Sequence, residues 1–178
     1  MEAAERRAKI REILIASSRP VSAGVLSREL GVSRQAIVGD VALLRASNVP
    51  IAATPRGYVL QETGPRAGGT EHTIACRHTG ENMRQELYIV VDNGCGLLDV
   101  TVEHPVYGQL SGQLQIFSRF DADDFLGRLE KSRSLPLCGL TGGVHLHTIF
   151  CPTEEAYRRV LEQLEANGIL FGRDENDA

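Results

Sequence analysis

Apolar residues recur at helical spacing in three stretches of the first fifty residues. The pattern predicts helices over 4–16, 22–30 and 33–48. Pro20 interrupts the chain after the first stretch, and Gly31 follows the second stretch as a helix stop would. The second and third stretches begin at serines, which favour the helix N-cap. The front of the chain is therefore predicted to contain three helices, with a short turn between the second and the third.

Two helices joined by the turn Leu30-Gly31-Val32-Ser33 are typical of a helix-turn-helix. The second helix of such a motif lies in the major groove of DNA, with its N-terminal residues against the base edges.

In this chain the N-terminal residues of the second helix of the motif are Ser33, Arg34 and Gln35. All three can donate hydrogen bonds to bases or phosphates. Asp40 on the same helix weakens the electrostatic attraction slightly. We therefore predict that this helix recognises DNA.

A hairpin with a basic tip is predicted after the third helix. The apolar segments 51–54 and 58–60 flank Pro55-Arg56-Gly57, so Arg56 could contact the phosphate backbone as the tip of a wing. Residues 1–60 carry nine Lys/Arg and five Asp/Glu, a net charge of +4, whereas the remainder carries ten and eighteen, a net charge of −8. This asymmetry indicates that only the front half meets a polyanion.

The remainder of the chain predicts a linker and a second domain. Glycine and proline without apolar periodicity indicate a linker over 62–71, between a winged helix-turn-helix domain, 1–61, and a second domain, 72–178. In the second domain, patterns typical of strands and helices predict strands over 73–78, 97–102, 110–117, 143–150 and 169–171, and helices over 81–92, 122–129 and 153–166. Strands and helices without regular βαβ alternation predict an α+β fold with helices packed on a sheet.

His145 and His147 stand two residues apart in the strand predicted over 143–150. Their side chains therefore project from the same strand face, which suits one Zn, Ni, Fe or Co ion. The alternative is a pair of polar residues on a solvated face. His78 and Glu86 are candidate partners, because a carboxylate on the helix after His78 could reach back toward a site at the sheet edge. Together they would make a site of three histidines and one carboxylate.

The four cysteines indicate a reducing environment. They show neither CxxC spacing nor disulfide-rich density, so we expect reduced thiols in a cytoplasmic protein. Cys76 shares a strand face with His78 and is either a soft metal ligand or, as we expect, part of the core. The N-terminus is charged from Glu2 to Glu12, and no apolar run approaches membrane-spanning length.

These motifs together resemble a known family across essentially the whole chain. The segment from Arg6 to Leu60 resembles the winged helix of many bacterial repressors. The strings IACRHTGENMRQELYIVVDNG, DVTVEHPVYGQL and LPLCGLTGGVHLHTI resemble the three-histidine (3H) domain. That domain stands behind a helix-turn-helix in bacterial transcriptional repressors of NAD biosynthesis and nicotinate uptake. Carried over by position, the resemblance implies a divalent metal held by His78, Glu86, His145 and His147.

The resemblance also implies a function. We expect a homodimeric repressor, not an enzyme, that binds a palindromic operator near genes of NAD biosynthesis or niacin uptake, with nicotinic acid as co-repressor. The candidate effector-binding residues are His104, Arg77 and Thr141. For His104, which Pro105 follows, shaping a turn is the first interpretation and ligand contact the second.

Two other functions stay open on the residues alone. A metal with an open coordination position could activate water, as in an amidase-like hydrolase fused to a DNA-binding domain. Against it, no carboxylate beside the histidines in sequence is an evident general base, and no nucleophile motif is present. The third function is a repressor that senses the metal itself.

Overall fold

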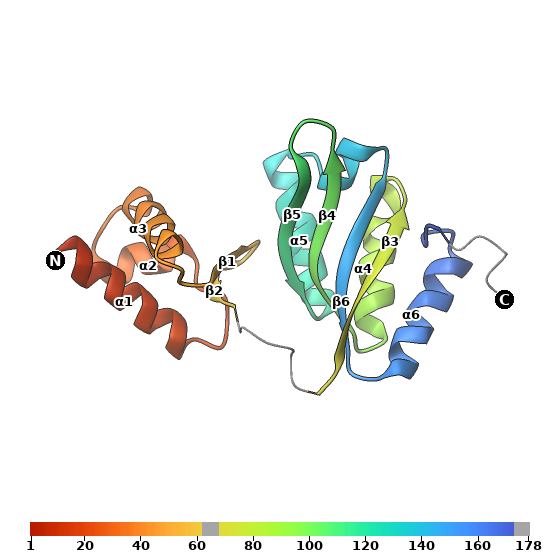
Figure 1. The fold of residues 1–178 in the computed structure, drawn as a ribbon, viewed down its shortest axis with the longest axis horizontal. Coiled ribbons are helices and arrows are strands. Elements are labelled where there is room, and N and C mark those ends of the chain that lie inside the picture. Colours follow the sequence, from red (N-terminus) through yellow and green to blue (C-terminus); the bar gives the residue numbers. More distant parts are fainter. Residues whose placement is uncertain (62–67, 173–178) are drawn as a thin grey trace. The chain divides into compact units, whose positions relative to one another are not determined.

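The computed structural model describes residues 1–61 and 68–172 (Figure 1). The chain divides into two compact units, Met1–Gly64 and Pro65–Ala178, each with its own hydrophobic core. Of the predicted linker, residues 62–67 lie outside the described part, whereas its last two residues, Thr70 and Glu71, already belong to a strand of the second unit.

The first unit contains three helices and a hairpin. Its elements are α1 (Ala3–Ala16), α2 (Ala23–Leu30), α3 (Arg34–Ala46), β1 (Ile51–Thr54) and β2 (Gly57–Leu60). The predicted caps are confirmed: the Ser22 and Ser33 hydroxyls accept hydrogen bonds from the backbone amides of Val25 and Ala36. Gly31 ends α2 in the left-handed conformation, with φ of 66°. The turn between α2 and α3 therefore has the helix-turn-helix form that the sequence predicts.

The hairpin is fixed to the segment that precedes α2. Val21 and Tyr58 exchange two backbone hydrogen bonds, each of 2.9 Å. Gly57 has φ of 145°, and a Cβ atom there would lie 2.5 Å from the Val21 carbonyl carbon, so the close approach requires glycine. This packing holds the turn between β1 and β2 in place beside the helices.

Asp40 of α3 is buried against α1 instead of facing DNA. Its carboxylate accepts a hydrogen bond from Arg6 Nε at 2.5 Å, and Arg7 Nη1 lies 3.6 Å from it. The two arginines offset the negative charge of Asp40, so Asp40 weakens the attraction for DNA less than the sequence suggests.

The second unit is a four-stranded antiparallel sheet covered by helices. Its strands are β3 (Thr70–Arg77), β4 (Gly96–His104), β5 (Gly108–Ile116) and β6 (Val144–Cys151), in the order β3-β6-β4-β5. Its helices are α4 (Met83–Asp92), α5 (Arg119–Ser132) and α6 (Glu154–Ala166), with 3-10 turns at Gly80–Asn82 and Leu137–Thr141. The α+β fold is as predicted.

The helices pack against one face of the sheet (Figure 1). Alternate residues of β6, from His145 to Cys151, are buried on this face, and α4, α5 and α6 all contribute side chains to the same core. The two histidines of β6 therefore lie under α4 rather than on a solvated face. None of the helices in the described ranges 1–61 and 68–172 has the length and apolar content needed to cross a membrane.

The segment after α6 returns to the edge of the sheet. The Arg77 amide donates to the Ile169 carbonyl at 2.8 Å, and the Phe171 amide donates to the Ala75 carbonyl at 2.9 Å. The strand predicted over 169–171 is thus present as a short bridge beside β3.

Candidate functional site

Strand pairing and one helix bring the predicted metal ligands together. In the antiparallel register of β3 and β6, Cys76 stands opposite His145, and Ile74 stands opposite His147. His78 follows the end of β3, and its backbone amide donates to the Gly143 carbonyl at 3.4 Å. The three histidines therefore cluster on the helix-covered face of the sheet.

Glu86 reaches this cluster from α4. The helix buries Met83, Leu87 and Val90 against the sheet, and Glu86 lies in the same stripe, only 1% exposed. Because α4 begins at Met83, Glu86 stands in its first turn and points down onto the sheet face, not back toward the sheet edge as expected. An acidic residue inside an otherwise apolar helical stripe is the sequence signal that identifies it.

The imidazoles converge on the Glu86 carboxylate through one nitrogen each. Nε2 of His78 lies 2.7 Å from Oε2, while Nε2 of His145 and of His147 lie 3.1 and 3.5 Å from Oε1. All four side chains are at most 4% exposed. The four predicted ligands thus form one buried group.

The other ring nitrogen of each histidine is held by a backbone carbonyl. His78 Nδ1 donates to Thr79 O at 2.6 Å, His145 Nδ1 to Gly143 O at 2.8 Å, and His147 Nδ1 to Asp99 O at 2.7 Å. A carbonyl oxygen only accepts, so each Nδ1 carries a proton. This arrangement is typical of metal-binding histidines, whose second nitrogen is oriented by a hydrogen bond to a carbonyl or carboxylate.

Gly143 makes part of this geometry possible. Its φ is +96°, and a Cβ atom there would lie 2.4 Å from the His78 carbonyl oxygen. The close approach of the chain before β6 to the end of β3 therefore requires glycine at this position.

The electrostatics of the cluster favour a cation at its centre. Burial by itself raises the pKa of Glu86, but the charge of His147 and hydrogen bonds from the three histidines outweigh burial and hold that pKa well below its usual range. Burial lowers the pKa of His78 and of His147, yet the Glu86 carboxylate raises both pKa values overall. If the imidazoles were neutral, their Nε2 lone pairs would face the negatively charged Glu86 carboxylate and repel it. Protons or a metal ion on the Nε2 atoms remove that repulsion, so the donor set fits a divalent metal.

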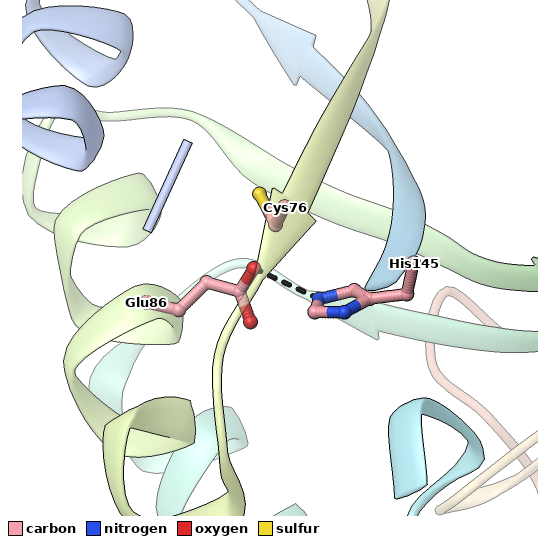
Figure 2. A group of neighbouring side chains, drawn as sticks. All are labelled: Cys76, Glu86 and His145. Carbon is pink, nitrogen blue, oxygen red and sulfur yellow. Dashed lines mark hydrogen bonds and ion pairs between the residues drawn. The ribbon is translucent and has the colours of Figure 1, made fainter. Parts of the chain in front are cut away.

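Cys76 belongs to the same group. Its Sγ atom, a Glu86 carboxylate oxygen and a His145 ring nitrogen all lie within 4.8 Å of one another. Figure 2 shows Glu86 pointing from α4 toward Cys76 and His145. Burial, then the Glu86 charge, raises the pKa of the Cys76 thiol far above its usual range.

None of the hydrogen bonds or ring contacts described for the three predicted effector residues joins them to the four cluster residues. His104 Nδ1 accepts hydrogen bonds from the amides of Val106 and Tyr107, so His104 shapes the turn between β4 and β5. Arg77 is exposed, with its guanidinium 5.9 Å from the centre of the Phe171 ring. Thr141 donates to a main-chain carbonyl at 2.5 Å in the turn before β6. Their contact with an effector stays a prediction.

The predicted DNA-binding residues lie at the start of α3 and in the hairpin turn. Ser33, Arg34 and Gln35 are exposed, and the Ser33 hydroxyl oxygen also caps α3. The Arg34 guanidinium lies against Gly24 of α2, where a Cβ atom would come within 2.6 Å of it. The half-exposed Arg56 lies in the turn of the wing. The N-terminus of α3, with the exposed side chains of Ser33, Arg34 and Gln35, is suited to phosphate.

Comparison with known proteins relates both units to described domains. An HTH domain matches residues 6–59, and a 3H domain matches residues 71–173. A probable transcription repressor NiaR of Thermotoga maritima is 44% identical over 167 residues, and transcription repressor NadR of Bacillus subtilis is 39% identical over 169 residues. Each alignment covers 94% of this chain and 94% of the relative. The chain therefore belongs to the family of proteins that carry a 3H domain behind a helix-turn-helix domain.

Proposed function

We propose that the protein is a transcription repressor of NAD biosynthesis and niacin uptake genes, with nicotinic acid as co-repressor and a divalent metal in its second unit. The helix-turn-helix and the repressor names of two relatives that align over nearly the whole chain support the regulatory part. The same relatives favour a regulator over the amidase-like hydrolase. A DNA-binding repressor acts where the DNA is, and we therefore place the protein in the cytoplasm.

The observation that carries the metal part is the convergence of three Nε2 atoms on one buried carboxylate, with all three Nδ1 atoms held by carbonyls. His78, Glu86, His145 and His147 would hold the ion. Imidazole and carboxylate donors suit Ni, Zn, Fe or Co. A metal ion held by these residues would supply a Lewis acid for a carboxylate oxygen of the effector.

A groove beside the cluster offers space for such an effector. A cavity of about 420 Å³ lies between the start of α4 and α5, two residues beyond His78. Apolar side chains of Met83, Leu126 and Leu129 line it together with two arginines and two glutamates, Arg84, Arg133, Glu81 and Glu130. Its two arginines and two glutamates balance in charge, so the groove offers space but no net attraction for an acid.

DNA recognition is assigned to Ser33, Arg34, Gln35 and Arg56. A palindromic operator contacted by a homodimer would place one α3 in each half-site. In the homodimer, the effector must bind more tightly when the two helix-turn-helix units are arranged for DNA binding than when they are not. A ligand with equal affinity for the two arrangements would leave their populations unchanged.

A gel-shift titration tests the proposal. Metal-loaded protein is titrated onto a DNA fragment from the promoter region of a niacin-uptake or NAD-biosynthesis gene, with nicotinic acid, with nicotinamide, or with neither. We expect tighter binding with nicotinic acid only, because nicotinamide lacks the carboxylate. Equal affinity in all three titrations contradicts the effector assignment, and tightening by metal alone supports a metal-sensing repressor instead.

A further inference from the structure

The second unit contains a sulfur donor that faces the proposed metal site. Cys76 stands directly opposite His145 in the register of β3 and β6, on the same face of the sheet. Directly opposite residues on antiparallel strands have Cβ atoms about 5 Å apart, a separation that one metal ion spans. The side chain is fully buried, with 0% exposure.

The sulfur lies with the nitrogen and oxygen donors rather than apart from them. Cys76 Sγ, a Glu86 oxygen and a His145 nitrogen are mutually within 4.8 Å. Figure 2 shows these three side chains as neighbours that come from β3, α4 and β6. Three donors from three elements, all buried, make a built site rather than an isolated thiol.

We propose that Cys76 binds the metal through its sulfur, so that the site is a mixed sulfur, nitrogen and oxygen centre. The inference rests on the proposed metal site. The thiol proton leaves as the sulfur binds the cation, as it does at cysteine-bound zinc. A thiolate shifts the preference of the site toward Zn²⁺ and Co²⁺ and away from hard ions such as Mg²⁺ and Mn²⁺.

Cobalt spectroscopy tests this directly. The full-length protein is stripped of metal by chelation, and Co²⁺ is added to one equivalent. Wild type is expected to show both the visible d–d bands of bound Co²⁺ and a near-ultraviolet sulfur-to-cobalt charge-transfer band. Cys76→Ser is expected to keep the d–d bands and lose the charge-transfer band. Cys138→Ser is the matched control, because Cys138 is also buried, and burial and then the Glu86 charge raise its pKa, but it lies outside the donor group.

X-ray absorption at the zinc edge of the wild-type protein needs no variant and is expected to show one sulfur at about 2.3 Å. Bound Co²⁺ or Zn²⁺ with no sulfur signal overturns the role of Cys76 while leaving the proposed metal site intact. A charge-transfer band that survives in Cys76→Ser also overturns it. Failure of wild type to bind either ion removes the metal site and this inference together.

Discussion

Replacing Glu86 by glutamine in the metal-free protein removes the negative charge at the centre of the histidine cluster. The raised pKa values of His78 and His147 stabilise the fold below about pH 6.5, the ordinary histidine pKa, and this contribution is lost as the pH rises through the raised values. The lowered pKa of Glu86 stabilises the fold above about pH 4.3, and this contribution is lost as the pH falls through the lowered value. The cluster therefore stabilises the metal-free fold most between about pH 4.3 and pH 6.5.

The magnitude follows from the burial of the partners. Removing one member of a buried ion pair costs about 3–5 kcal/mol. The side chains here are at most 4% exposed, so solvent screens them little. We expect Glu86→Gln to lower the free energy of unfolding by about 3 kcal/mol at pH 6. The loss should shrink as the pH rises through the raised pKa values of His78 and His147, because these two histidines then lose their charge and leave Glu86 as a buried charge without a counterion.

Urea unfolding followed by circular dichroism, in the presence of a chelator, measures this difference across the pH range. Wild type and variant differ only in the second unit, so subtracting their free energies cancels the first unit. A loss of the same size at pH 6 and at pH 9 would refute the argument, because it would show that Glu86 does not interact with charged histidines.

Four further predictions concern other parts of the structure. Gly143→Ala should cost at least about 1–3 kcal/mol by urea unfolding, since alanine is strained at φ of +96° and its Cβ would meet the His78 carbonyl; an unchanged midpoint would contradict this. Arg34→Ala should weaken specific operator binding by about 1–3 kcal/mol in fluorescence anisotropy if Arg34 contacts a base, and equal weakening on random DNA would assign it to phosphate instead. Arg56→Ala should lower the slope of log K against log salt concentration by about one, whereas an unchanged slope would exclude a phosphate contact. Saturating Zn²⁺ at about a thousand times its Kd should stabilise the second unit by about 4 kcal/mol, and calorimetry showing no shift would argue against a preformed site.

The sequence predicts the first unit closely because local signals define its ends. Ser22 and Ser33 cap the helices as expected, and Gly31 ends α2 in the left-handed conformation that glycine favours. In the second unit Ser118 caps α5, so the helix begins at Arg119, three residues before the predicted start at residue 122. Of these three residues only Phe120 is apolar, and its side chain is exposed, so periodicity gives no signal there.

The site is predictable in part. Two histidines two residues apart on a strand must share a face, and that rule identifies His145 and His147 without any tertiary information. The register that sets Cys76 opposite His145 depends on pairing between strands almost seventy residues apart, which no local pattern determines. Glu86 enters the site because α4 packs its apolar stripe on the sheet, and that docking is likewise a tertiary property.

The central claim is that His78, Glu86, His145 and His147 hold one metal ion. The most direct measurement is the metal content per chain of wild type and of the His145→Ala, His147→Ala double variant, by mass spectrometry after equilibration with Ni²⁺ or Zn²⁺ and removal of excess. The claim predicts one ion per chain in wild type and none in the double variant, with circular dichroism showing that the variant is folded. A folded double variant that retains a full equivalent of metal would contradict it.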